Sequence, residues 1–249
     1  TTIHGLSVPL DYYDIRISDA IDRLGAETIH RVCMATGDPA YCDRIHRDQY
    51  GSIWISDEGY TDLSDQNVGD QTAKGIDLNA NYHNRLGAAG FLAPDFMGTY
   101  MLSSNLTNPD VDYECAGYFG NRCGQPQSLW RHRFRATWES AFRLNLTLAW
   151  RLIGPADNDF ASPSPDLEDP EMLAFYAVNG SDRIRAYNWF DFAASYTLRN
   201  GLKFTLGVNN ILDEEPPLLP DYADWAYINL YANYDPLGRY IFGSLQFNF

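Results

Sequence analysis

Between Trp130 and Arg151 the sequence alternates, one position at a time, between large apolar side chains and charged or polar ones. A period of two places alternate side chains on opposite faces of an extended strand. We therefore predict two strands, over residues 130–139 and 142–151, joined by a tight turn at Ser140 and Ala141. One face would carry Trp130, His132, Phe134, Ala136, Trp138, Phe142, Leu144, Leu146, Leu148 and Trp150, and the other Arg131, Arg133, Arg135, Thr137, Glu139, Arg143, Asn145, Thr147, Ala149 and Arg151.

Other stretches alternate in the same way, and together they predict eight strands. Residues 76–82, 190–198, 202–208 and 241–249 are regular, whereas residues 12–21 and the stretch near residue 100 are less so. The Asn200-Gly201 pair is a strong signal for a two-residue hairpin turn. We interpret residues 51–84 as one long, interrupted strand.

The predicted connections are sorted by length. Those at 140–141 and 200–201 are tight, and the one at 85–95 is moderate. Those spanning about 18–50, 106–128, 154–182 and 213–238 are long and rich in Pro, Gly and Asp. Short turns at one end of the strands and long loops at the other are typical of an outer-membrane barrel. A soluble antiparallel sheet covering a core would explain the alternation, but not this sorting.

The composition is compatible with strands that cross a membrane. Mean hydropathy is −0.36 and the hydrophobic content is 45%, as in soluble proteins, but the wall of a β-barrel is only half apolar. No run reaches the ~18 apolar residues that a membrane helix requires. The aromatic content of 14% would supply girdles at the two membrane interfaces. Burying the arginine face in lipid would cost about 2–4 kcal/mol per arginine near the midplane, so we expect that face to line a watery interior.

The four cysteines form two local pairs inside long connections. Cys33 and Cys42 lie close together in the sequence, as do Cys115 and Cys123. We predict two disulfides and an oxidising compartment. A zinc site is the alternative, but neither a CxxC spacing nor a nearby His/Cys quartet supports it.

Charge and motifs argue against several functional classes. A net charge of −15 disfavours a nucleic-acid surface, which requires clustered Lys and Arg. The five histidines follow no ligand spacing, so no metal site is predicted. No GxSxG, HExxH or paired-carboxylate motif is present, and we expect a protein that is not an enzyme and needs no cofactor. Because the chain starts at Thr1, we expect that a signal peptide has been removed or that the chain is a piece of a longer protein.

Four segments together resemble TonB-dependent outer-membrane receptors. VNNILDEEPP at 208–217 is similar to the end of that family's penultimate strand, and YDPLGRYIFGSLQFNF at 234–249 to its final strand, which closes on phenylalanine. NVGDQTAKGIDL at 67–78 and YYDIRISDAI at 12–21 resemble two earlier strands. The residues that carry the likeness are Asn67, Gly69, Gly75, Ile76, Asp77, Leu78, Asn209, Asn210, Ile211, Leu212, Asp213, Pro216, Gly238, Arg239 and Phe249.

The resemblance implies an antiparallel transmembrane β-barrel segment. Such receptors have about 22 strands around a plug, so residues 1–249 would form the C-terminal third of the barrel, without the plug or the preceding strands. The family takes up scarce ligands such as metal chelates, cobalamin or oligosaccharides across the bacterial outer membrane. Expected partners are outer-membrane lipid, the TonB complex through the plug, a small-molecule ligand, and the barrel-assembly machinery through a final strand that carries Phe247 and Phe249.

A complete eight-stranded barrel with a structural or adhesin role is the alternative. Such a barrel would pair its first strand with its last, whereas a segment of a larger barrel would leave both edges open.

Two groups of side chains are candidates for ligand contact. In the loop at 220–235 they are Asp221, Tyr222, Asp224, Trp225 and Tyr227, whose rings suit stacking and whose carboxylates accept hydrogen bonds. This loop would alternatively fold on its own aromatic residues or belong to the outer girdle. On the polar face they are Arg131, Arg133 and Arg143, which would bind an anionic chelate or pair with carboxylates of the interior or plug.

Overall fold

The computed structural model describes residues 3–22, 24–108, 111–120, 122–164, 167–199, 201–219 and 233–247. The chain divides into two compact units, which we treat separately. The sheet unit contains Thr1–Asp14, Ala73–Ser104 and Cys115–Phe249. The loop unit contains Ile15–Thr72 and Asn105–Glu114.

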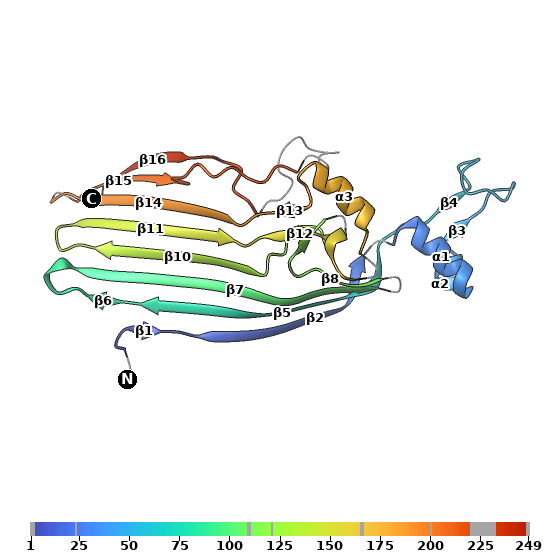
Figure 1. Ribbon diagram of the computed structural model, residues 1–249, viewed down its shortest axis with the longest axis horizontal. Helices are drawn as coiled ribbons and strands as arrows, with labels where there is room; N and C mark the ends of the chain where they lie inside the picture. Colours follow the sequence, from blue (N-terminus) through green and yellow to red (C-terminus); the bar gives the residue numbers. More distant parts are fainter. Residues whose placement is uncertain are drawn as a thin grey trace. The chain divides into compact units, whose positions relative to one another are not determined.

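One antiparallel β-sheet dominates the protein (Figure 1). Along the sheet the order is β1-β5-β7-β10-β11-β14-β15-β16, and β2 also pairs with β5. The bounds are β1 Leu6–Ser7, β2 Leu10–Asp22, β5 Gln66–Tyr82, β7 Phe91–Asn108, β10 Trp130–Glu139, β11 Leu144–Ile153, β14 Tyr187–Thr197, β15 Leu202–Asn209 and β16 Tyr240–Phe247. Among the described residues eight of these strands are long, as predicted, but the predicted strand at 51–84 begins only at Gln66.

The strand registers confirm that the two faces of the sheet are chemically different. Phe134 of β10 lies opposite Phe96 of β7 and Trp150 of β11, whereas Arg133 lies opposite Met97 and Arg151. Trp150 in turn lies opposite Phe190 of β14. We call the side with Phe134 the apolar face and the side with Arg133 the arginine face.

The apolar face is bare. Its side chains include Leu206, Ile241 and Leu245, which are 68%, 71% and 64% exposed. Leu148 and Phe192, opposite each other near the middle of β11 and β14, are also exposed. The described residues place no second layer over these side chains, which a soluble two-layer protein would need. An apolar surface of this extent marks contact with another apolar phase.

Aromatic residues gather at both ends of the apolar face. Toward the long loops, the rings of Phe96, Trp130, His132, Trp150 and Phe190 follow one another across four strands, with neighbouring centroids 4.3–6.2 Å apart. The indole N–H of Trp130 donates to Nδ1 of His132, and that of Trp150 donates to Oδ1 of Asn188. At the other end, Trp138 donates to the carbonyl of Ala89. Satisfied indoles at both strand ends are typical of membrane-interface girdles.

The three short connections lie at one end of the strands (Figure 1). The hydroxyl oxygen of Ser140 accepts hydrogen bonds from the amides of Phe142 and Leu144, and Arg143 has a φ of +64°. The turn therefore extends to Arg143, and β11 starts at Leu144, so the prediction that Phe142 and Arg143 continue the strand is wrong. The β14–β15 hairpin turns at Gly201, whose φ is +85°. Between β5 and β7 the chain forms β6 (Asn84–Arg85) and the 3-10 helix η1 (Gly87–Ala89).

The long connections contain helices that the all-β prediction missed. In the loop unit these are α1 (Ala26–Thr36) and α2 (Pro39–Cys42), followed by the short strands β3 (Ile45–His46) and β4 (Tyr60–Thr61). In the sheet unit, α3 (Pro170–Val178) follows the 3-10 helix η2 (Asp159–Ala161). Within the described ranges, no helix combines the length and the apolar composition needed to cross a membrane. The short strand β8 (Val111–Glu114) pairs antiparallel with the end of β7.

Both predicted disulfides are confirmed. Cys33 bonds to Cys42 between α1 and α2, and Cys115 bonds to Cys123 in the connection that precedes β10. The first joins helix α1 to helix α2, and the second closes a short loop after β8.

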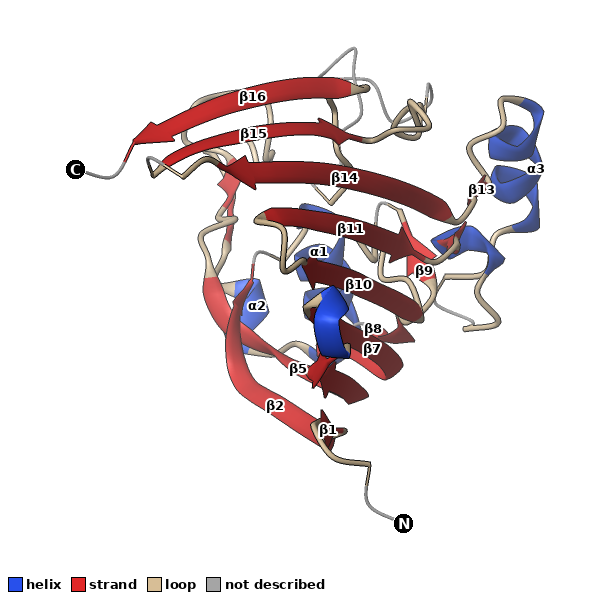
Figure 2. Cartoon of the chain, turned by 90° about the vertical axis from the view of Figure 1, so that its left-hand side faces the viewer, coloured by secondary structure: helices blue, strands red, loops and turns tan. Residues whose placement is uncertain are grey.

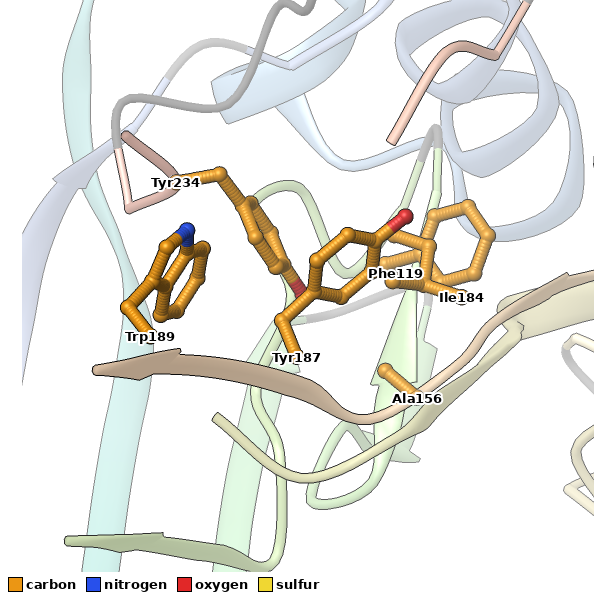
Figure 3. Packing of buried hydrophobic residues seen from close by; sticks show 6 residues of the cluster. All are labelled: Phe119, Ala156, Ile184, Tyr187, Trp189 and Tyr234. Atoms are coloured by element: carbon orange, nitrogen blue, oxygen red, sulfur yellow. The ribbon is translucent and has the colours of Figure 1, made fainter. Parts of the chain in front are cut away.

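The connections of the sheet unit share a core (Figure 3). Phe119 of β9 (Tyr118–Phe119), Ala156 of β12 (Ala156–Asn158) and Ile184 of β13 (Arg183–Ile184) pack there, and Tyr234 joins from the connection that precedes β16. Tyr187 and Trp189 of β14 complete the cluster from the arginine face. Three long connections are therefore packed together against the ends of the strands.

The sheet is open among the described residues. Its order ends at β16 on one side and at β1 and β2 on the other, and no pairing joins these edges (Figure 2). A complete eight-stranded barrel would join them, so the alternative fold is not supported. In lipid, both edges need further strands because unpaired backbone groups are too costly there.

We expect Leu148→Arg to destabilise the complete barrel by about 2–4 kcal/mol, because it places a cation on the apolar face near the middle of the strand. The matched control is Thr147→Arg, one residue away on the arginine face, which should cost less than about 1 kcal/mol. Urea unfolding of the complete protein in liposomes measures both. Equal losses would show that the two faces meet the same medium.

In the loop unit, Asp48 accepts hydrogen bonds from the amides of Tyr50 and Ser52 and from the hydroxyl of Ser56. Burial raises the pKa of the Asp48 carboxyl, but the hydrogen bonds from Ser52, Tyr50 and Ser56 outweigh it and hold the pKa below its ordinary 3.8. The backbone and side-chain hydrogen bonds of Ser64, together with Arg44, lower the pKa of Asp62.

A lowered folded-state pKa means that this stabilisation is complete above pH 3.8 and is lost as the pH falls through the folded pKa. We expect amide protection at Tyr50 and Ser52 to collapse only below pH 3.8. Asp48→Ala should abolish that protection at neutral pH, and Asp57→Ala should not. Hydrogen exchange corrected for its intrinsic pH dependence tests this, and protection that persists in Asp48→Ala would refute it.

Candidate ligand-binding site

The arginine face carries a row of cations from two neighbouring strands. Arg131, Arg133 and Arg135 alternate along β10, and Arg151 lies on β11 directly opposite Arg133. The exposed side chains of the β10 arginines rise from the sheet rather than lie buried within it. The chain as a whole is acidic, with 33 acidic and 18 basic residues, so this row of positive charges differs from the rest of the protein.

Two adjoining hollows lie on this face near the long connections. The first has a volume of about 290 Å³ and is lined by Met97, Thr99, Arg131, His132, Arg133, Arg151, Leu152, Ile153, Trp189, Asn233 and Asp235. The second, of about 400 Å³, is lined by Met101, Cys123, Gln125, Pro126, Gln127, Ser128, Arg131, Ile153 and Asn233. They share Arg131, Ile153 and Asn233, so one ligand would be able to extend through both. We call the first the arginine hollow.

Arg151 is fully engaged within the protein. Its Nε lies 3.1 Å from Oδ2 of Asp191, and its Nη2 lies 3.5 Å from Oδ2 of Asp235. The guanidinium carbon also lies 5.6 Å from the ring centre of Trp189. The side chains of Arg151, Asp191 and Asp235 are each about one-third exposed or less. Solvent therefore screens these ion pairs less than it screens a pair on the surface.

The VNNILD motif positions this network. Asn210 is buried with a φ of +52°, and its amide donates to Oδ1 of Asp191 at 2.8 Å. Its side chain exchanges two hydrogen bonds with the backbone of Glu214 and closes a turn directly after β15. Asn tolerates a left-handed conformation and bonds its own backbone neighbours, so the motif residue is suited to this turn.

The glycine-arginine element of the last strand is tied to the same turn. The amide of Arg239 donates to Oδ1 of Asp213 at 2.6 Å, and its Nε donates to the carbonyl of Ile211 at 3.0 Å. Both ends of the last long connection are thereby fixed where β15 ends and β16 begins.

Arg131 and Arg133 differ from Arg151 in forming no ion pair within the part of the chain that the structure describes. Among the described residues no carboxylate lies within ion-pair distance of either guanidinium. On this face Asp77 accepts from Thr99 at 2.7 Å, Asp191 and Asp235 pair with Arg151, and Asp95 lies opposite Arg135. The hollow is therefore bordered by three arginines and the carboxylate of Asp235.

Two of the predicted contact residues lie together, and their role in ligand contact stays a prediction. Arg131 and Arg133 line the arginine hollow together, as an interior ligand contact requires. Arg143 lies in the turn at the opposite end of β10 and β11 and does not line either hollow. Asp221, Tyr222, Asp224, Trp225 and Tyr227 lie outside the described residues, so their predicted role stays a prediction.

Several residues of the site were missed by sequence reasoning. Trp189, Asp191, Asn233 and Asp235 were not among the candidates, although the alternation of β14 placed Asp191 on the polar face. Asp235 lies 84 positions from Arg151, which no local pattern reveals. The described residues contain no group of three or more His, Cys, Asp and Glu side chains arranged to hold a metal ion.

The sequence of this barrel wall matches a protein-family model. Residues 4–211 match the model described as TonB dependent receptor-like, beta-barrel. The chain belongs to this family. TonB-dependent receptors are outer-membrane proteins, and this receptor segment is accordingly an outer-membrane β-barrel wall with its strands in antiparallel order.

Solved structures of TonB-dependent receptors share the fold of this segment. A mutant of the ferric enterobactin receptor PfeA from Pseudomonas aeruginosa is 16% identical, with a TM-score of 0.57 over 98% of the chain and 29% of the receptor. The copper transporter OprC is also 16% identical, with a TM-score of 0.51 over 99% of the chain and 29% of the transporter. The chain thus spans under a third of these receptors. No protein with curated annotation is similar enough in sequence to count as a relative.

We expect Asp191→Ala to destabilise the complete receptor by about 1–3 kcal/mol, because it leaves Arg151 short of a partner and removes an acceptor from the amide of Asn210. The control is Asp157→Ala, which breaks the Asp157–Arg183 pair, whose side chains are 47% and 61% exposed. That loss should stay below about 1 kcal/mol. Thermal unfolding in detergent compares the two variants, and equal costs would contradict a structural role for the Arg151 network.

Proposed function

We propose that this chain is the C-terminal third of the barrel of a receptor that takes up a scarce ligand by TonB-energised transport. The observation that carries the proposal is the family match over residues 4–211, joined to a wall whose arginine face holds two adjoining hollows. A plug and the earlier strands would precede residue 1, and the TonB complex would act through that plug. The proposed activity is transport, not catalysis, and needs no cofactor.

The two faces of the wall have separate roles in this proposal. The apolar face contacts outer-membrane lipid, supported by its bare aliphatic side chains and its aromatic ends. The arginine face lines the interior and contributes ligand contacts through Arg131 and Arg133. The loop residues Asp221, Tyr222, Asp224, Trp225 and Tyr227 are proposed as further contacts from outside, and Arg143 as an interior cation nearer the short turns.

The last strand has a proposed role in assembly. Phe247 of β16 pairs with Leu202 of β15 and is about half exposed at the edge of the sheet. Together with Phe249, which lies outside the described residues, it would be recognised by the barrel-assembly machinery. An exposed strand edge that ends in aromatic residues supports this proposal because an edge offers unpaired backbone groups to a partner strand.

The proposed ligand is a scarce nutrient such as a metal chelate, cobalamin or an oligosaccharide. Two receptors with the same fold are named for a ferric chelate and for copper, which makes metal-bearing ligands the first class to test.

Deletion of the complete gene should abolish uptake of one such ligand under limitation. Cells with and without the gene are compared for accumulation of labelled ferric chelates, copper, cobalamin and oligosaccharides, each in the presence and absence of TonB. We expect one ligand to require both the gene and TonB. Uptake of all four classes that is unchanged by the deletion, or that needs the gene but not TonB, would overturn the proposal.

A further inference from the structure

A fully buried carboxylate lies in the connection that follows β11. Asp159, the first residue of η2, is 0% exposed. Its Oδ2 accepts hydrogen bonds from the amides of Arg122 and Cys123, at 2.8 and 3.0 Å. Its Oδ1 has no hydrogen-bond partner, and Asp159 forms no ion pair among the described residues. Because burying a carboxylate is costly, the position of Asp159 depends on these two backbone amides.

Both amides belong to a loop that a disulfide closes. Cys115 and Cys123 are bonded eight positions apart. At the far end of this loop the backbones of Gly120 and Gly124 exchange two hydrogen bonds, of 3.1 and 2.8 Å. Gly120 has a φ of +147°, and a β-carbon there would collide with Oδ1 of Asp159. The loop is therefore shaped to seat this carboxylate, and only glycine suits position 120.

The disulfide loop is also part of the wall of the second hollow. Cys123 lines that hollow, and so do the next residues of the same connection, Gln125, Pro126, Gln127 and Ser128. The Nε2 of Gln127 donates to the carbonyl of Cys123 at 3.3 Å, so the loop and the wall beyond it are directly joined. Asp159 comes from a different connection. Its carboxylate therefore fastens one long connection to another beside the hollow.

The other disulfide, Cys33–Cys42, has no such carboxylate. Two carboxylates are buried among the described residues, those of Asp48 and Asp159. Asp48 accepts its hydrogen bonds from Tyr50, Ser52 and Ser56, all outside the loop that this disulfide closes. Within the described ranges, only the disulfide of the sheet unit is therefore coupled to a buried carboxylate.

We infer that the Cys115–Cys123 disulfide and Asp159 form a redox-sensitive switch on the second hollow. In the oxidised protein the closed loop holds the amides of Arg122 and Cys123 on the buried carboxylate. A thiol reductant breaks the sulfur–sulfur bond: each cysteine takes up one electron and one proton and becomes a thiol, and two thiols of the reductant lose these and join as a disulfide. The opened loop no longer fixes the two amides, so the carboxylate moves toward water and the wall of the hollow loosens.

The second hollow gives the reductant a route to this bond. Cys123 lines the hollow, whose volume is about 400 Å³, whereas Cys115 is only 3% exposed. A small thiol therefore attacks at Cys123 from the hollow. The switch goes beyond the proposed uptake and does not depend on which ligand the receptor transports.

The first test is hydrogen exchange of the complete receptor in detergent, before and after reduction with the dithiol dithiothreitol. We expect the amides of Arg122 and Cys123, and those of residues 160–162, to exchange at least about tenfold faster after reduction, because opening of the loop removes their local protection. Reoxidation should restore slow exchange. The same response should persist in Cys33→Ser with Cys42→Ser, which leaves only Cys115–Cys123 to be reduced.

The second test uses the reciprocity of coupled equilibria. If Asp159 stabilises the oxidised loop, its replacement must favour reduction. Asp159→Asn should be half reduced at a ratio of reduced to oxidised dithiothreitol about tenfold lower than the wild type requires. The matched control is Asp157→Asn, two residues away, whose side chain is 47% exposed and should change this ratio by less than about twofold. Mass spectrometry of trapped thiols gives the reduced fraction.

Three results would refute the switch. They are exchange at Arg122 and Cys123 that reduction leaves unchanged, an Asp159→Asn ratio equal to that of the wild type, or a shift as large in Asp157→Asn. The exchange measurement needs only the wild-type receptor, so it decides the question even if Asp159→Asn does not fold. Ligand uptake enters none of these criteria, so failure of the switch leaves the proposed uptake standing.

Discussion

A polypeptide in hydrocarbon must pair every backbone N–H and C=O within itself, and this constraint governs the whole chain. It requires long antiparallel strands, which appear here as β2, β5, β7, β10, β11, β14, β15 and β16. Strands in turn impose a period of two, so the apolar and polar side chains have to separate onto opposite faces. The pairing of Phe134 with Trp150, and of Arg133 with Arg151, is the direct result.

The same separation concentrates charge on one face. Once lipid excludes arginine from the outward positions, four arginines of β10 and β11 gather on the inward ones. Their mutual repulsion is reduced where the chain supplies carboxylates, as Asp191 and Asp235 do for Arg151. Arg151 and the two arginines Arg131 and Arg133 border the same hollow. The exclusion of arginine from lipid therefore determines which positions of the wall carry charge.

The sequence predicts this wall well because the signal is local. Alternation along 130–151 sets the faces, and a tight turn then sets which residues lie opposite each other. The same rule fails at Arg143, because a left-handed φ of +64° takes the residue out of the strand while the letters continue to alternate. The register and the faces of the strands follow from residues that are close in sequence. The conformation of the turn depends instead on the hydroxyl of Ser140, which accepts hydrogen bonds from two backbone amides.

The helices and the core of the long connections were missed for different reasons. α1 is bounded by Gly25 and Gly37, and α2 starts with Asp38 as N-cap and Pro39 as its first residue. These capping signals are present in the sequence, but Gly, Asp and Pro are also typical of loops. α3 is apolar on all sides and has no helical period to detect. The Arg151–Asp235 contact joins residues 84 positions apart, so its formation depends on tertiary packing alone.

The shared core of Phe119, Ile184 and Tyr234 ties three outward connections into one body at their bases. Substitutions and insertions at the exposed tips of those connections cost little stability, because they disturb little packing. Substitutions at the bases are costly, because a change in one buried side chain disturbs the packing of the other two. Insertions at the tips should therefore be tolerated, whereas a change at one base requires compensating changes in the residues packed against it.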